Sequence, residues 1–165
     1  GPRMPLKRRL RETDAKERRQ NATNVKDARS VMSTPSPRKS WWRRWFGSRS
    51  ERAASRYLKR QGYRILRRNY SCPVGEVDLV ACEDRTLVFV EVRSTQSEDA
   101  ERTAHSVDET KQKKLTKTAL YFLQRHRLLD HPARFDVLVI SWPPDQSEPL
   151  IEHHRHAFEA TGNFS

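Results

Sequence analysis

Three β-rich segments follow one another between residues 63 and 93, and they constrain the fold of this chain more than any other feature. Strands are predicted at Tyr63–Tyr70, Val74–Cys82 and Leu87–Arg93. The polar residues Glu83–Thr86 separate the last two segments and predict a tight turn. The third segment is almost entirely apolar, which is typical of a strand inside a sheet. A hairpin with one buried strand is therefore expected at the centre of the fold.

Helical and strand patterns flank this hairpin. A helix is predicted over Glu51–Gln61, because its apolar residues recur at three- and four-residue spacing, with Ser50 as its N-cap and Gly62 ending it. After the hairpin, the patterns predict a polar loop at residues 94–106 and a helix at 107–127. They then predict a buried strand at 134–142 and an edge strand at 151–156. The predicted class is therefore α/β, with an αβββαβ core in which helices flank a mixed central sheet.

Positive charge is concentrated in the first fifty residues. They hold 15 of the 33 Lys and Arg but only 4 of the 21 Asp and Glu. Large apolar residues such as Leu6 and Leu10 are scattered there, too few to offset the chain entropy of folding, so at most a solvated helix is expected at Arg8–Gln20. We therefore predict a disordered basic tail at 1–47, a folded domain at 48–158 and a flexible C-terminus at 159–165.

An aromatic and basic segment, Trp41-Trp42-Arg43-Arg44-Trp45-Phe46, lies near the end of this tail. It has three interpretations. In the first, the aromatic residues cover an edge of the domain or the segment is a simple linker. In the second, the aromatic residues stack on unpaired bases while the arginines contact phosphate. In the third, the segment lies at a membrane interface. The segment is too short to decide among them.

Composition excludes several classes of protein. No stretch of 18 apolar residues is present, so no integral membrane association is expected. Cys72 and Cys82 are the only cysteines, too few for a disulfide scaffold, which favours a reducing, cytoplasmic setting. A glycine-rich phosphate loop is absent as well.

Charged residues alternate along the two hairpin strands. Glu76 and Asp78 share one face of their strand, and Glu91 and Arg93 share a face of the next. A turn centred on Asp84-Arg85 places Asp78 opposite Glu91 and Glu76 opposite Arg93. Directly opposed Cβ atoms are about 4.5–5.5 Å apart. Two carboxylates so close repel each other unless a cation or a shared proton relieves them.

This arrangement suits a hard cation. Mg²⁺ or Mn²⁺ binds carboxylate oxygens, and Mg²⁺ completes its shell with waters and a substrate phosphate. Asp78 and Glu91 are the expected ligands, and Glu51 is a third carboxylate within possible reach. Simpler interpretations stay open: a salt bridge between Glu76 and Arg93, solvent-facing positions for Asp78 and Glu91, and a favourable interaction of Glu51 with its helix dipole.

A longer pattern of residues carries a resemblance to a known family. In chain order it comprises Ser50-Glu51, Ala54, Tyr57-Leu58, Gly62-Tyr63, Ile65-Leu66, Asn69-Tyr70, Gly75-Glu76-Val77-Asp78-Leu79-Val80, Leu87-Val88-Phe89-Val90-Glu91-Val92-Arg93, Lys111-Gln112-Lys113-Lys114-Leu115, Ala119, Tyr121-Phe122-Leu123 and Arg134-Phe135-Asp136-Val137. Over roughly residues 50–158 the chain resembles the bacterial YraN-like family. The resemblance implies a restriction-endonuclease-like PD-(D/E)xK core, similar to archaeal Holliday junction resolvases.

The resemblance also implies roles for individual residues. Asp78 is the motif aspartate, Glu91 the (D/E) residue, and Arg93 stands where the motif has lysine. Glu51 corresponds to a helix carboxylate of the resolvase-like branch. Because arginine stays protonated, it holds phosphate but does not act as a base, and Lys111 is the candidate substitute.

The lysines of the second helix, Lys114 among them, form a candidate phosphate-contacting strip. Asp136 is expected to be structural. The histidines at positions 153, 154 and 156 are interpreted as surface residues.

Together these features predict an Mg²⁺- or Mn²⁺-dependent endonuclease that hydrolyses DNA phosphodiesters, including branched or otherwise structured DNA. Asp78, Glu91, Arg93 and Glu51 are the expected catalytic residues, and Lys111, Lys114 and Glu76 the expected substrate contacts. The alternative is a catalytically inactive nucleic-acid-binding or scaffold protein on the same fold. The oligomeric state, homodimer included, stays open.

Overall fold

The computed structural model describes residues 4–24, 38–95 and 100–161, with side chains omitted at 20–24, 38–48 and 100–101. Its elements are α1 (Leu6–Asn24), α2 (Arg38–Arg60), β1 (Arg64–Cys72), β2 (Gly75–Glu83), β3 (Thr86–Thr95), α3 (Ala100–His105), α4 (Glu109–Arg125), β4 (Ala133–Ser141) and β5 (Leu150–Phe158). The order from α2 onward contains the predicted αβββαβ sequence. The α/β class is confirmed.

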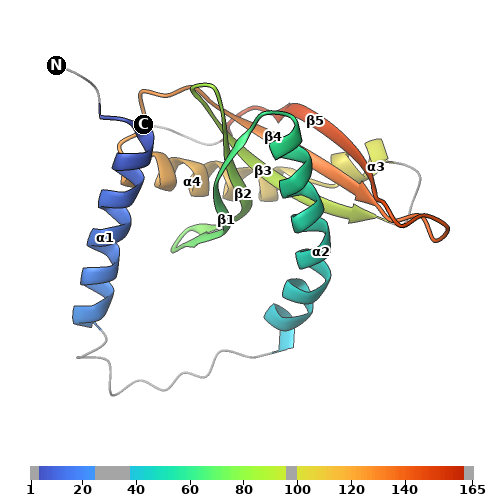
Figure 1. Ribbon diagram of the computed structural model, residues 1–165, viewed down its shortest axis with the longest axis horizontal. Coiled ribbons are helices and arrows are strands. Elements are labelled where there is room, and N and C mark those ends of the chain that lie inside the picture. The colour runs from blue at the N-terminus through green and yellow to red at the C-terminus, as the bar shows by residue number, and fades with distance from the viewer. Residues whose placement is uncertain (1–3, 25–37, 96–99, 162–165) are drawn as a thin grey trace.

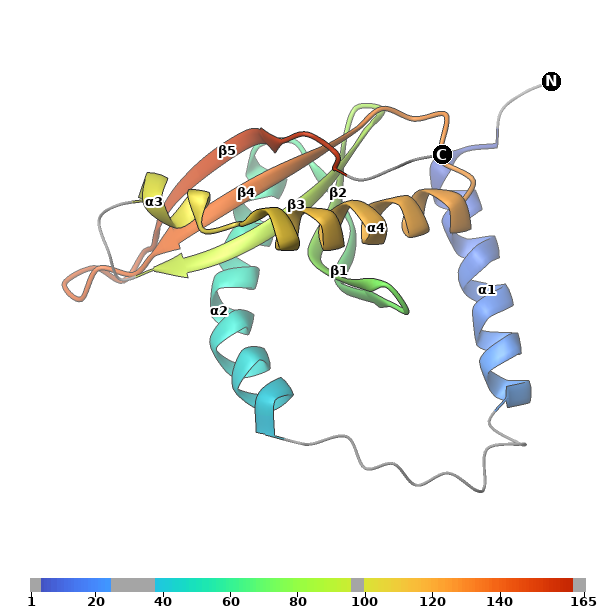
Figure 2. The same ribbon diagram turned by 180° about the vertical axis from the view of Figure 1, so that it is seen from behind.

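The strands form one five-stranded sheet in the order β1-β2-β3-β4-β5. Strand β3 pairs with β4 in parallel, and the other neighbours are antiparallel. A parallel pair needs a long crossover, which α3 and α4 supply. Figures 1 and 2 show α2 on one face of the sheet and α4 on the other. The predicted mixed sheet flanked by helices is thus confirmed.

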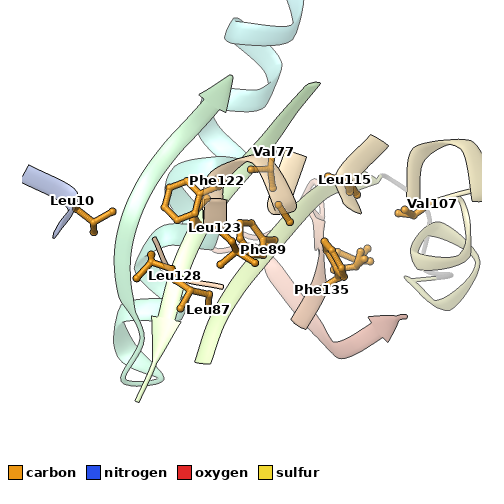
Figure 3. Packing of buried hydrophobic residues seen from close by; sticks show 14 residues of the cluster. Leu10, Val77, Leu87, Phe89, Val107, Leu115, Phe122, Leu123, Leu128 and Phe135 are labelled. Atoms are coloured by element: carbon orange, nitrogen blue, oxygen red, sulfur yellow. The ribbon is translucent and has the colours of Figure 1, made fainter. Parts of the chain in front are cut away.

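Alternation along β3 sends its side chains into two separate cores. Phe89 packs with Phe122 of α4 in one cluster, which Figure 3 shows. Val88 and Val90 pack on the opposite face, against Leu58 of α2. Because both faces of β3 are covered, its near-continuous apolar sequence is explained.

Helix α2 ends as expected but begins earlier. Gly62 has φ +90°, and the Tyr63 amide donates to the Leu58 carbonyl at 3.0 Å, which closes the helix in the manner of a glycine C-cap. The prediction that Ser50 is an N-cap is wrong, because the helix starts at Arg38. The Ser50 hydroxyl instead accepts a hydrogen bond from Trp142 Nε1 at 3.0 Å.

The aromatic and basic segment at residues 41–46 forms part of the α2 backbone. Its side chains lie outside those that the structure describes. The three interpretations of the segment therefore stay predictions.

Helix α1 is not the solvated helix that its sequence predicted. Leu10 is 6% exposed and belongs to the core cluster of α4 and the sheet (Figure 3). Arg67 of β1 donates two hydrogen bonds to the Asp14 carboxylate, at 2.7 and 2.8 Å. Arg125 of α4 pairs with Glu17. These partners are distant in sequence, which is why the local composition of α1 did not reveal its docking.

Two smaller differences concern the ends of the domain. Helix α3 lies within the region predicted as a polar loop at 94–106. The predicted edge strand is confirmed, but it extends over Leu150–Phe158. Residues 25–37 and 162–165 fall outside the described part of the chain, so the predicted domain boundaries are untested. No helix in the described part is long and apolar enough to cross a bilayer.

Candidate functional site

The candidate site lies where β2 and β3 separate. The β2–β3 register pairs Glu83 with Thr86 at the turn and Leu79 with Val90 at the far end, which is the predicted register. Beyond Leu79 the ladder stops, although β2 stays paired with β1 down to Gly75. Asp78 and Glu91 are the first residues past this fork, so both carboxylates lie at the point where the sheet opens.

The two carboxylates interact directly, as predicted. The Asp78 and Glu91 carboxylates are close enough for each to shift the pKa of the other. The Val92 amide donates to Asp78 Oδ2 at 2.8 Å. Burial raises the pKa of Asp78, and burial together with the Asp78 charge raises the pKa of Glu91 to about 7. The pair therefore takes up a cation or keeps a proton near neutral pH.

Two positive side chains flank Glu91 from different elements. Lys111 Nζ lies 3.5 Å from Glu91 Oε1, and Arg93 Nε lies 3.6 Å from the same oxygen. Lys111 reaches the site from the first turn of α4, which the Asp108 carboxylate caps by accepting from the Lys111 amide at 2.8 Å. Lys111, which the resemblance offered as a substitute for the motif lysine, thus lies beside the motif.

Arg93 leaves a donor without an acceptor. Its Nε atom is buried and forms no hydrogen bond. A buried N–H without an acceptor is costly, by about 1–3 kcal/mol, and is rare in native proteins. An anionic oxygen placed beside Glu91 would satisfy this donor.

Glu51 enters the cluster from α2, on the opposite face from α4. Burial raises its pKa, a hydrogen bond from the Asn69 side chain opposes this, and the charges of Asp78 and Glu76 raise it further. The predicted grouping of Glu51 with Asp78 is therefore present. Sequence analysis gave Asn69 no role. Asn69 has a φ of +49° in the middle of β1, a backbone conformation that asparagine tolerates. An asparagine inside a β-rich segment was the one sequence feature that could have indicated a special role for this residue.

The predicted pairing of Glu76 with Arg93 is wrong. Glu76 lies opposite Ser71 of β1, because the β2–β3 ladder has ended before it. It still contributes negative charge near Glu51. Lys114 is exposed on α4, and within the described residues it makes no contact with the carboxylate pair.

A second buried carboxylate, Asp136, serves the fold. Arg134 Nε donates to it at 3.0 Å, His153 Nε2 lies 2.7 Å from it, and the His156 amide donates to it at 3.0 Å. These hydrogen bonds outweigh the effect of burial and lower the pKa of Asp136. Asp136 is structural, as predicted, but the prediction that His153 is a surface residue is wrong. The network ties β5 to β4, a pairing in space that composition alone does not reveal.

The donor set at the fork fits a hard divalent cation in part. Within the described part of the chain, no three His, Cys, Asp or Glu side chains converge in the manner of a ready-made metal centre. Asp78 and Glu91 nevertheless offer adjacent carboxylate oxygens. Mg²⁺ is commonly held by one or two carboxylates, with water and substrate phosphate completing its shell.

Comparison with known proteins identifies the family. The model of the uncharacterised protein family UPF0102 matches residues 50–140. A UPF0102 protein of Rhodopirellula baltica is 40% identical over 119 residues, which cover 70% of this chain and 71% of that protein. The chain belongs to the UPF0102 family. The YraN-like resemblance is thereby confirmed.

Two further UPF0102 relatives show how the match is distributed. That of Geotalea uraniireducens is 43% identical over 113 residues, 68% of this chain and 88% of its own length. That of Geobacter sulfurreducens is 45% identical over 114 residues, also 68% and 88%. The UPF0102 family match spans α2 from Ser50, the strands β1–β3, the helices α3 and α4, and most of β4. Helix α1 lies outside the matched residues.

Proposed function

We propose that this UPF0102 protein is a divalent-metal-dependent endonuclease that hydrolyses DNA phosphodiesters. The observation that carries the proposal is the Asp78–Glu91 pair, beside which Arg93 Nε and Lys111 Nζ lie 3.6 and 3.5 Å from Glu91 Oε1. Carboxylates for a cation and positive groups for a phosphate are thus gathered at one fork in the sheet. The αβββαβ order and the position of the pair also agree with a restriction-endonuclease-like core.

The donors suggest which residues would hold the cation and what it would supply. Asp78 and Glu91 would bind Mg²⁺ or Mn²⁺ once both are ionised. A divalent cation bound there lowers the pKa of a coordinated water and polarises the phosphodiester. Glu51, which already accepts a hydrogen bond from Asn69, would orient the attacking water.

The positive side chains would bind the substrate. Arg93 Nε, which forms no hydrogen bond within the described part of the protein, would donate to a non-bridging phosphate oxygen and stabilise the charge that grows there during attack. Lys111 would hold the same phosphate from α4. In the net reaction, water adds to phosphorus, one P–O ester bond breaks, and the leaving oxygen is protonated.

The test compares cleavage by matched carboxamide variants. Full-length protein, Asp78→Asn and Glu91→Gln are incubated with linear duplex, single-stranded and four-way-junction DNA, each with Mn²⁺, Mg²⁺ or EDTA. We expect metal-dependent cleavage that falls at least 100-fold in both variants. The control is Glu152→Gln, a change of the same type on β5 at an exposed position, which should cleave as the wild type does.

Absence of cleavage by every form, with no metal binding by calorimetry, would contradict the proposal. DNA binding that persisted under those conditions would favour the second candidate, a binding or scaffold protein on the same fold. Arg93 in the motif lysine position is the observation on which that candidate rests.

A further inference from the structure

A basic groove lies between α1 and the corner where α2 leads into β1. It has a volume of about 600 Å³. Its walls carry the basic residues Lys7, Arg11, Lys59, Arg64 and Arg67, and its apolar floor includes Ile65 and Leu66. Asp14 is the single acidic residue of the lining. The groove is therefore strongly positive.

The acidic residue of the groove is already neutralised. Arg67 Nη2 contacts both Asp14 oxygens, at 2.7 and 2.8 Å. Within the described part of the chain, the side chains of Lys7, Arg11, Lys59 and Arg64 have no hydrogen-bond or ion-pair partner. Four positive charges thus converge on one hollow with no internal counter-charge. Such clustering of exposed like charges creates a positive potential that attracts anions.

A larger hollow on the other side of α1 differs in this respect. It measures about 830 Å³ and is also lined by basic residues. Its Arg9 lies 3.7 Å from Asp130, and its Arg125 pairs with Glu17. Several of its charges are thus satisfied within the protein, so the smaller groove is the stronger candidate for an anionic ligand.

The docking of α1 explains why the groove is positive. The side chains of α1 that face the domain include Leu10, Asp14 and Glu17, and the two acidic ones bind arginines of β1 and α4. Lys7 and Arg11 lie one helical turn apart and are exposed. Docking thus pairs Asp14 and Glu17 with arginines of the domain, while Lys7 and Arg11 line the groove.

Strand β1 connects the groove to the candidate site. Arg64 lines the groove, and Asn69, five residues along the strand, contacts Glu51. At about 3.3 Å per residue these two positions are about 17 Å apart. Duplex DNA advances 3.4 Å per base pair, so the separation corresponds to about five base pairs. A duplex that contacted both positions would therefore need at least about five base pairs.

We propose that this groove binds the phosphate backbone of DNA, and that α1 thereby extends the nucleic-acid surface beyond the UPF0102 core. The inference rests on the proposed function, because it takes the same DNA as its ligand. Charge complementarity selects a polyanion, and the proposed function selects DNA among polyanions.

The test measures how DNA binding depends on salt. Full-length protein and the Lys7→Gln/Arg11→Gln variant are titrated with a fluorescent duplex in EDTA, over a series of NaCl concentrations. Each lost phosphate contact reduces the slope of log K against log salt by about 0.9. We expect the variant to bind more weakly at low salt, with a slope shallower by about 2.

The matched control is Arg85→Gln/Arg155→Gln. It removes the same charge from the β2–β3 turn and from β5, the sheet edge opposite β1. It should keep the wild-type slope. Thermal melting checks the fold. Lys7→Gln/Arg11→Gln should melt as the wild type does, because Lys7 and Arg11 have no partners to lose, whereas the control loses the exposed Arg155–Glu83 ion pair, worth at most about 1 kcal/mol.

The inference would be overturned if the wild type did not bind duplex, or if both variants lost DNA affinity equally. It would also be overturned if, in a parallel titration with phosphatidylglycerol vesicles, Lys7→Gln/Arg11→Gln lost only vesicle binding. Because the titration is done in EDTA, it does not depend on catalysis. Groove-dependent binding without any cleavage would refute the nuclease alone. Cleavage with an unchanged salt slope would refute the groove alone.

Discussion

At the scale of single residues, the raised pKa of Glu91 makes stability depend on pH. The pKa of Glu91 is about 7, above its ordinary value of 4.5. The folded protein therefore keeps a proton that the unfolded chain releases as the pH rises. It follows that the metal-free protein loses stability between about pH 4.5 and pH 7.

Metal binding should show the opposite dependence, because it needs both carboxylates ionised. We expect Mn²⁺ to raise the melting temperature at pH 8 and to leave it unchanged at pH 5. A cation at 100 times its Kd stabilises the fold by about 2.7 kcal/mol. Thermal-shift measurements at both pH values test this. The Glu91→Gln variant should not respond, and an equal response at pH 5 would contradict the assignment.

Other single residues were beyond prediction because their roles depend on distant partners. His153 is buried only because β5 lays it against Asp136. Asn69 matters because β1 carries it to Glu51 of α2. Neither of these two contacts produces a periodic pattern in the sequence from which it could have been predicted.

At the scale of elements, α1 should behave as a docked part of the domain. Leu10 is 6% exposed and packs in the main core, whereas Leu129 is 58% exposed. We expect Leu10→Ala to weaken the attachment of α1 by about 2 kcal/mol, because it leaves a cavity. Leu129→Ala, the matched change at an exposed position, should alter stability by less than about 0.5 kcal/mol.

Amide hydrogen exchange measures this locally. Exchange in α1 should become roughly 30-fold faster in Leu10→Ala, which is the rate equivalent of 2 kcal/mol, while β3 keeps its protection. Equal exchange of α1 in the wild type and in both variants would show that the helix is not held by Leu10.

The strands and the site helices were largely predictable. Alternation and the Glu83–Thr86 turn indicated the β2–β3 register, which brings Asp78 and Glu91 together. The early start of α2 and the short helix α3 were not predicted. Serine at position 50 favours caps as well as solvated helix positions, so its residue type alone did not locate the helix start.

At the scale of the whole molecule, the candidate site and the basic groove are separate parts of one surface. Positions about 17 Å apart along β1, without shared partners, should act independently. We expect the free-energy effects of Asp78→Asn and of Lys7→Gln/Arg11→Gln on DNA binding to add within about 0.5 kcal/mol in the combined variant. Titrations of the three variants in EDTA measure this, and coupling above 1 kcal/mol would contradict independence.

The sequence by itself determined the order of the elements, the pairing of β2 with β3 and the meeting of Asp78, Glu91 and Lys111. These follow from local periodicity, turn chemistry and a family pattern, all of which are written along the chain. Only the tertiary structure decided that the β2–β3 ladder stops at Leu79, that Arg93 Nε is left without an acceptor, and that α1 docks. These features depend on contacts between segments that are far apart in the sequence. Local sequence patterns do not show which of those segments will pack together.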